Sequence, residues 1–217
     1  DDVESRGLGD VYKRQVESDG ERTFLTLPGI ECTFEKEWFD ALDVTEYDSV
    51  YICGYEIEGD GGDQIIDFLE KNRDLDIYYA PGPRITYISG EKHNRIMKLH
   101  PVLHLNEKEA IDFTGCGSME EAATKLEQMT DNRVIITVGS KGAYLQENGH
   151  GMLIPSEKAA VVDTIGAGDS HIGAVISAVM CQKSFEAAVA VANRVSAAVV
   201  GVEGPSISEE EFQQINF

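Results

Sequence analysis

The sequence is short of positive charge, of long apolar runs and of paired cysteines. Its 217 residues include 18 lysines and arginines against 39 aspartates and glutamates, which gives a formal net charge of −21. Such a charge repels a polyphosphate backbone, so we expect no nucleic-acid partner. No run approaches the roughly 18 apolar residues of a membrane span, and no secretory signal opens the chain. We therefore expect no membrane association.

The four cysteines, Cys32, Cys53, Cys116 and Cys181, lie far apart along the chain. No CxxC pair and no histidine at ligand spacing accompanies them, so neither a zinc site nor a redox pair is indicated. Idle or buried thiols are typical of a reducing compartment. We therefore expect a cytoplasmic protein.

The first residues differ in character from the rest of the chain. The stretch from Ser5 to Gln15, SRGLGDVYKRQ, resembles the translation of a transposon adapter used in sequencing libraries. A genuine surface arm is the alternative interpretation. We expect residues 1–15 to be a non-native, adapter-derived segment, and the authentic sequence to begin mid-gene near Val16 without its N-terminal part.

From Val16 onward, short β-rich runs alternate with helical stretches. This alternation predicts βαβ units and a mostly parallel sheet with helices on both faces, with ligands at the carboxyl ends of the strands. No linker divides residues 31–217, so we expect one α/β domain there. The expected strands are 22–27, 49–54, 76–80, 102–106, 133–139 and 143–146, and the clearest expected helices are 61–72, 118–129, 167–180 and 185–200.

The stretch VVDTIGAGDSHIG, residues 161–173, has the composition of a phosphate-binding turn. A dinucleotide fingerprint would need glycine at His171, and a P-loop would need lysine at Ala174, so both fail. What remains is a glycine-rich turn whose backbone amides, at Gly166, Ala167 and Gly168, could point at an anion from a helix N-terminus. Local chemistry leaves Asp169 open between a helix cap and a base for a hydroxyl that attacks phosphorus.

Several ordered motifs then resemble one family. DTIGAGD (residues 163–169) is similar to the DTxGAGD signature of the ribokinase-like, or PfkB, family of carbohydrate and nucleoside kinases. NEKE (106–109) resembles the family's NxxE motif, VIITVGSKGAYL (134–145) its TxGxxG strand and hairpin, and DGERTFLTLPG (19–29) its lid strand. The resemblance covers about residues 16–217. In YYAPGPR (78–84), however, the family's usual aspartate is missing, which leaves any role of Arg84 in doubt.

The resemblance implies a ribokinase-like three-layer α/β/α fold with a mostly parallel central sheet and the remnant of a small β lid. Residues 16–30 would be a partial lid strand, and residues 31–217 the α/β domain without its first strands. Because those strands carry most acceptor contacts in the family, most of the acceptor pocket would be absent. Lid strands often mediate dimers in this family, so a homodimer through the lid is expected of the full-length protein.

The resemblance also implies a role for particular residues at the transfer site. Asp169 would be the catalytic base, and the amides of Gly166, Ala167 and Gly168 would form the anion hole. Asn106 and Glu109 would organise Mg²⁺, largely through water. The alternative for this pair is simply the end of a strand followed by a helix cap.

Other site residues follow from the same resemblance. Thr137, Gly139 and Gly142 would line the nucleotide phosphates and ribose. Asn193 would edge the adenine, although an asparagine on such a helix can also simply pair with a backbone group. Asp163, with the loop around Gly204, corresponds to a monovalent-cation site for K⁺ in some relatives. His171 stands where relatives usually have phenylalanine, and we expect it to be packed and hydrogen-bonded rather than catalytic.

The resulting hypothesis is an ATP-dependent kinase that transfers a phosphoryl group to a sugar hydroxyl, with ATP and Mg²⁺ as cofactors. A nucleoside kinase is the nearest alternative, because both acceptors share the transfer site. An alternative of another class is a non-catalytic fragment that at most binds nucleotide.

Overall fold

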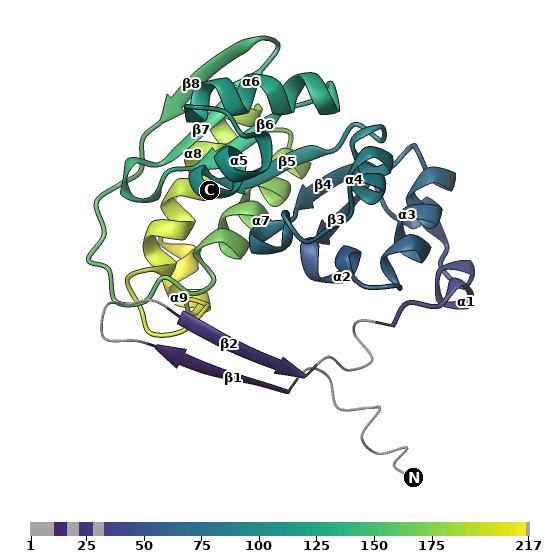
Figure 1. The fold of residues 1–217 in the computed structure, drawn as a ribbon. Coiled ribbons are helices and arrows are strands. Elements are labelled where there is room, and N and C mark those ends of the chain that lie inside the picture. The colour runs from purple at the N-terminus through teal and green to yellow at the C-terminus, as the bar shows by residue number, and fades with distance from the viewer. Residues whose placement is uncertain (1–10, 17–21, 28–32, 216–217) are drawn as a thin grey trace.

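The computed structural model describes residues 11–16, 22–27 and 33–215 (Figure 1). Its main body is a sheet with the strand order β3-β4-β5-β6-β7-β8. Strands β3 to β6 are parallel, whereas β7 and β8 each run antiparallel to the strand before them. The strands are β3 (Ser49–Cys53), β4 (Asp76–Ala80), β5 (Val102–Asn106), β6 (Val134–Thr137), β7 (Ala143–Glu147) and β8 (His150–Ile154).

Helices cover both faces of this sheet. They are α1 (Lys36–Asp40), α2 (Gly54–Glu58), α3 (Gly62–Lys71), α4 (Gly90–Met97), α5 (Glu107–Thr114), α6 (Met119–Thr130), α7 (Ala167–Met180), α8 (Phe185–Val199) and α9 (Glu209–Gln213). Short 3₁₀ helices lie at Val44–Glu46, Gly82–Arg84 and Gly139–Lys141. The mostly parallel sheet and the helices on both sides confirm the three-layer α/β/α prediction.

The central strands are largely apolar because the side chains of each strand pack into two separate cores, one on each face of the sheet. Successive side chains of a strand point to opposite faces. In β6, Val134 and Ile136 pack with helices α2 to α6, whereas Ile135 packs with α7 and α8. All three side chains have no exposed surface. Continuous apolar runs are therefore the expected pattern for a sheet covered on both faces.

Most predicted elements match the structure. The expected strand at 133–139 is shorter, because the chain enters the 3₁₀ helix Gly139–Lys141 right after β6. Strand β8 was not predicted. Its sequence, HGMLI, leaves four of five residues exposed, so the apolar alternation that marks a half-buried strand is absent.

A separate two-stranded antiparallel sheet precedes the main body. It consists of β1 (Val11–Val16) and β2 (Arg22–Leu27), and Figure 1 shows it beside the α/β body. Strand β2 coincides with the expected lid strand. Residues 11–15, assigned from the sequence to the adapter-derived segment, pair with β2 in the structure, and the boundary at residue 15 stays a prediction. The expected turn at Pro28 and Gly29 lies outside the described residues.

The structure shows the state of three of the four cysteines and the length of the helices. Cys53, Cys116 and Cys181 are free thiols, and Cys32 lies outside the described residues. Within the ranges that the structure describes, no helix is long and apolar enough to span a bilayer.

Candidate active site

Two pockets open near the carboxyl ends of the strands and meet at the start of α7. The helix pocket, of about 440 Å³, is lined by residues of the β6–β7 turn, the loop after β8, α7 and α8, among them Thr137, Gly139, Gly142, Ala167, Gly168, His171 and Asn193. The strand pocket, of about 500 Å³, is lined among others by Tyr51, Cys53, Tyr55, His104, Asn106, Glu109, Thr137, Gly168 and Asp169. Thr137 and Gly168 line both pockets. The two pockets therefore share part of their walls at the end of β6 and the start of α7.

The start of α7 depends on one glycine in a left-handed conformation. Gly166 is the N-cap residue and has a left-handed backbone, with φ at +74°. A Cβ atom there would lie 2.5 Å from the carbonyl oxygen of Pro205, so a larger residue needs a backbone shift. Asp169 is the third residue of the helix, and its exposed side chain lines the strand pocket. The structure thus gives the cap position to Gly166 and leaves Asp169 at the pocket.

The backbone amides before and within this first turn have few partners. The amide of Ala167 donates to the carbonyl oxygen of Thr164 at 3.4 Å, a long contact. The amides of Gly166 and Gly168 have no acceptor among the described residues. Free amides and the positive end of the helix dipole favour an anion at this point, which is the boundary of the two pockets.

Asn106 and Glu109 form a reciprocal cap at the start of α5. The Asn106 side chain accepts from the Glu109 amide at 2.8 Å, and Glu109 Oε2 accepts from the Asn106 amide at 2.9 Å. The strand-end and helix-cap geometry considered from the sequence is therefore present. The second carboxylate oxygen of Glu109 has no hydrogen-bond partner among the described residues, and both side chains line the strand pocket. Capping therefore leaves that oxygen free for a ligand.

The strand pocket has acidic character. Burial raises the pKa of the Glu109 carboxyl. Burial, followed by the charges of Cys53 and Asp169, raises the pKa of the Tyr51 hydroxyl. No lysine or arginine is found among the described residues that line this pocket. The pocket therefore suits a cation or a neutral polyhydroxyl compound better than an anion.

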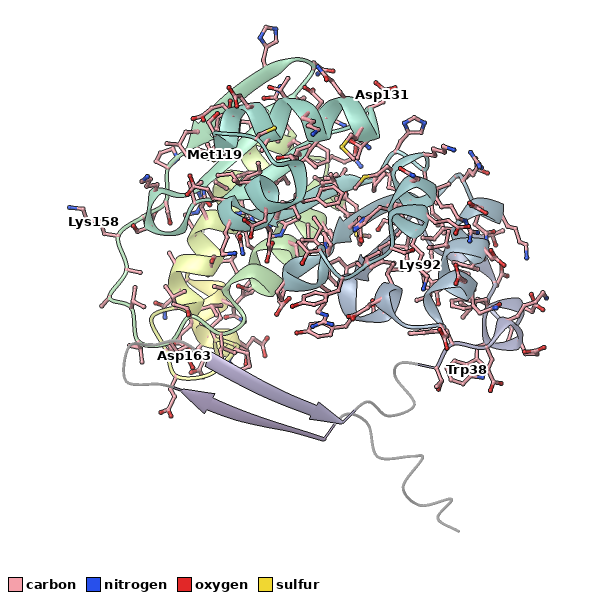
Figure 2. All side chains as sticks on the ribbon, viewed as in Figure 1. Trp38, Lys92, Met119, Asp131, Lys158 and Asp163 are labelled. Atoms are coloured by element: carbon pink, nitrogen blue, oxygen red, sulfur yellow. The ribbon has the colours of Figure 1, made fainter. Side chains whose placement is uncertain are left out.

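The β6–β7 turn forms the opposite wall of the helix pocket. Thr137 ends β6, and its hydroxyl donates to the carbonyl oxygen of Leu105 at 3.4 Å. Gly139 begins the 3₁₀ helix that follows. Gly142 has φ at +111°, and a Cβ atom there would lie 2.1 Å from the Ile154 carbonyl oxygen, so the end of β8 can approach closely. Lys158, in the loop after β8, extends away from the body (Figure 2).

A buried chain of three polar side chains connects the pockets. Asn193 Nδ2 donates to the Ile154 carbonyl oxygen at 2.9 Å, and Asn193 Oδ1 lies 3.1 Å from His171 Nε2. His171 Nδ1 lies 3.0 Å from His104 Nε2. Asn193 and His171 line the helix pocket, and His104 lines the strand pocket. His171 is packed and hydrogen-bonded as expected, and Asn193 makes the backbone contact weighed from the sequence.

Two further candidates line neither pocket. Asp163, in the loop before α7, accepts a hydrogen bond from the Ile165 amide at 3.1 Å (Figure 2). Arg84 is paired with Glu58, and its guanidinium carbon lies 5.6 Å and 4.3 Å from the ring centres of Tyr55 and Tyr87. Its cationic head is thus already used within the protein. Within the described residues, no group of three or more His, Cys, Asp or Glu side chains could hold a metal ion by itself.

The structure adds residues that the sequence reasoning missed. The strand pocket is also lined by Tyr51, Cys53 and Tyr55, which lie on β3 or directly after it. They come close to the residues of β5 because only β4 separates the two strands in the sheet. Strand order cannot be read from their spacing. His104 did carry a signal, since it is the one polar residue inside the otherwise apolar run Val102–Leu105, which is the buried part of β5.

Comparison with known proteins places the chain in a family. The model of the pfkB family carbohydrate kinases matches residues 10–211. The chain belongs to this family.

The chain aligns with only part of the length of individual relatives. The chain is similar to an uncharacterized sugar kinase, YegV, of Escherichia coli K12, with 32% identity over 193 residues, which are 87% of this chain and 60% of that protein. Arabidopsis thaliana ribokinase, solved with ribose and ATP, aligns with a TM-score of 0.74 at 22% identity, covering 94% of this chain and 68% of that one. The nucleoside kinase of Burkholderia thailandensis, solved with inosine, aligns with a TM-score of 0.70 at 20% identity, covering 90% of this chain and 62% of that one. The two structures share the fold, and the chain spans 60% of the length of YegV.

Proposed function

We propose that the chain carries the phosphoryl-transfer site of an ATP-dependent sugar kinase. ATP would occupy the helix pocket and the acceptor the strand pocket, so that transfer takes place beside Gly168. The observation that carries this proposal is the meeting of the two pockets at the start of α7, with Asp169 on the acceptor side. Membership of a carbohydrate kinase family supports it.

In this proposal the residues at the start of α7 perform the transfer. The acceptor oxygen bonds to the γ-phosphorus as the bond to the β-γ bridging oxygen breaks, and ADP leaves. Asp169 takes the proton of the attacking hydroxyl. The amides of Gly166, Ala167 and Gly168 donate to the equatorial oxygens of the transferred group, where charge is highest. Of these, Ala167 would have to give up its long contact with Thr164.

The residues at the start of α5 fit a magnesium ion. Among the residues that the structure describes, Glu109 offers a carboxylate oxygen without a hydrogen-bond partner, Asn106 lies beside it, and no basic side chain lines the pocket. Mg²⁺ prefers oxygen ligands and keeps several waters, so few protein ligands suffice. When bound, the ion would neutralise charge on the phosphate oxygens. Asn106 and Glu109 would hold its water shell, and their reciprocal cap fixes both side chains.

The remaining nucleotide assignments rest on placement in the helix pocket. Thr137, Gly139 and Gly142 would contact the phosphates and the ribose, and Asn193 would border the adenine. The Asn193 side chain is already hydrogen-bonded at both ends, so its part would be to shape the wall. A K⁺ site at Asp163 also stays a proposal, with the carboxylate already accepting the Ile165 amide.

A neutral sugar is the acceptor that the strand pocket favours. The described lining has the acidic residues Glu109 and Asp169 and the exposed rings of Tyr51 and Tyr55, with no basic residue to bind a phosphorylated acceptor. A nucleoside remains the alternative, since its ribose offers the same hydroxyls. Because the chain spans 60% of its relative YegV, a chain that binds nucleotide without turnover is the third candidate.

Several expectations about the whole protein remain predictions. They are a cytoplasmic location, the absence of nucleic-acid and membrane partners, and a homodimer through the lid sheet.

A screen for ADP release tests the proposal. The chain is incubated with ATP and Mg²⁺ and with D-ribose, D-fructose or inosine in turn, and ATP binding is measured separately by calorimetry. ADP release with a sugar supports the sugar kinase, and release with inosine alone supports the nucleoside kinase. ATP binding without release supports the third candidate, and failure to bind ATP contradicts the placement of the nucleotide.

A further inference from the structure

We propose that His104 is a ligand of the acceptor and holds one of its hydroxyls through Nδ1, and that His171 and Asn193 fix the tautomer of His104 from the other pocket. The inference rests on the proposed function, because it places the acceptor in the strand pocket. It adds a specificity-determining residue on β5 and two positioning residues on α7 and α8.

The orientation of the Asn193 amide determines the direction of the whole chain. Its Nδ2 faces two backbone carbonyl oxygens, of Ile154 at 2.9 Å and of Pro155 at 3.4 Å. Carbonyl oxygens only accept hydrogen bonds, so the NH₂ group must lie on this side. Asn193 Oδ1 therefore faces His171 Nε2 and can only accept from it. His171 carries its proton on Nε2.

The second step transfers this constraint to His104. A neutral His171 with its proton on Nε2 has an unprotonated Nδ1, which accepts. His104 Nε2, 3.0 Å away, must then be the donor. Burial supports neutral rings: it lowers the pKa of His171 to about 4. His104 is buried and has an uncharged histidine as its hydrogen-bond partner. His104 is thus left with a proton on Nε2 and a bare Nδ1.

The bare nitrogen has a place to act. His104 Nδ1 has no hydrogen-bond partner among the described residues. It differs from His93 Nδ1, which is sealed in the core without a partner. The residue His104 is 6% exposed and lines the strand pocket, with Asn106 and Asp169 in the same lining. A buried acceptor without a partner favours a ligand that donates, and a sugar hydroxyl does so.

A purely structural role explains less of this arrangement. Two buried imidazoles lose solvation that apolar side chains of the same volume would not lose. Within the described residues, three of the four ring nitrogens have hydrogen bonds, and the fourth, Nδ1 of His104, belongs to a residue that lines the strand pocket. An unsatisfied buried polar atom costs stability unless it is used.

Nitrogen NMR of the chain labelled with ¹⁵N-histidine tests the tautomer without reference to activity. We expect His171 and His104 each to show a proton on Nε2 and none on Nδ1 at neutral pH. The His171→Phe variant, which removes the middle of the chain, should leave His104 in a mixture of tautomers. A proton on Nδ1 of His104 in the wild-type chain overturns the proposal.

Acceptor affinity tests the ligand role. His104→Gln places an amide N–H where Nε2 was, so the bond to His171 can persist while the acceptor at Nδ1 is lost. In calorimetry with ATP present, we expect D-ribose, D-fructose or inosine, whichever binds the wild-type chain, to bind this variant about tenfold more weakly. ATP affinity and melting temperature should change little. His93→Gln, at a buried histidine that lines neither pocket, is the matched control and should leave acceptor affinity unchanged.

The possible outcomes separate this inference from the proposed function. Equal acceptor affinity in wild type and His104→Gln overturns the role of His104 and leaves the kinase proposal intact. If none of the three probes binds the wild-type chain while ATP does, the acceptor assignment falls and the nucleotide half of the proposed function stands. An equal loss in His93→Gln would show a general effect of buried histidines and would also overturn the assignment.

Discussion

The two pockets of this chain are built in different ways. The helix pocket takes all its lining from one contiguous part of the chain, Thr137 to Val200. The strand pocket takes its lining from Tyr51 to Ile172 and relies on sheet order to bring β3, β4 and β5 together. It also lies next to β3, whose outer edge has no partner strand among the described residues. The comparison shows why family motifs identify the first pocket readily and describe the second only at the starts of α5 and α7, without the residues that β3 and β4 supply.

The largest effect is expected where the pockets meet. Asp169→Asn keeps the size of the side chain and removes the base, so turnover in an active preparation should fall by about 100- to 10,000-fold. ATP affinity, which we assign in the proposal to the helix pocket, should stay nearly unchanged. ADP release and calorimetry measure the two effects.

The control for this variant is Asp112→Asn, on α5, where Asp112 pairs with Lys108 and lines neither pocket. It should retain full turnover. Near-normal turnover of Asp169→Asn would sink the role proposed for this carboxylate.

The next effect concerns stability at the shared wall. Gly166→Ala places a methyl group against Pro205 in a left-handed backbone, so we expect a loss of about 1–3 kcal/mol in the free energy of unfolding. At Gly168, by contrast, a Cβ atom meets nothing within 4 Å. Gly168→Ala should therefore keep stability and instead reduce turnover, because its methyl group projects where both pockets meet.

Urea unfolding and ADP release, measured on both glycine variants, distinguish the backbone requirement from the steric one. Equal stability of the two variants would contradict the strain assigned to Gly166.

A smaller effect is expected at the carboxylate of the strand pocket. Glu109→Gln retains an oxygen that can accept a hydrogen bond from the Asn106 amide, but it loses the charge. We therefore expect Mg²⁺ to bind about tenfold more weakly, so that half-maximal turnover needs about ten times more Mg²⁺, with little change in folding. Magnesium titrations of turnover measure it. Glu107→Gln, in the same helical turn but outside the pocket lining, is the matched control.

Glu109 also predicts a pH dependence of stability. Burial raises its pKa in the folded chain, so the folded state holds the proton more tightly than the unfolded state does. The contribution of this group to stability is therefore present at low pH and is lost as pH rises from its ordinary value near 4.5 through the raised value. Glu109→Gln should remove this part of the pH profile, and denaturant unfolding at several pH values measures it. A variant profile identical to that of the wild type would contradict the raised pKa.

The smallest effect is expected at Arg84. Its partly exposed pair with Glu58 should contribute no more than about 1 kcal/mol. Because Arg84 lines neither pocket, Arg84→Gln should change turnover less than twofold. A large loss of acceptor affinity in Arg84→Gln would instead indicate that Arg84 contacts the acceptor.

Much of the framework was predictable because local patterns decide it. The parallel strands appear as apolar runs since both faces are covered, and α7 and α8 follow from their small apolar residues. Asn106 and Glu109 were expected together from the NxxE motif, and the helix cap considered as the alternative spans the same three-residue interval. The contact of His104 with His171 spans 67 positions and crosses from strand to helix, so no spacing in the sequence reveals it. Strand β8 was missed because four of its five residues are exposed, so its sequence carries no apolar alternation.

The close approach of Pro205 to Gly166 affects where a tag or fusion can be inserted near the end of the chain. The segment from 201 to 208 is a surface connection of the kind that usually tolerates tags and insertions. Here the Pro205 carbonyl backs directly onto the turn that precedes α7. A fusion joined beside Pro205 would therefore press from behind on the amides proposed to bind phosphate, whereas one joined beyond α9 would not.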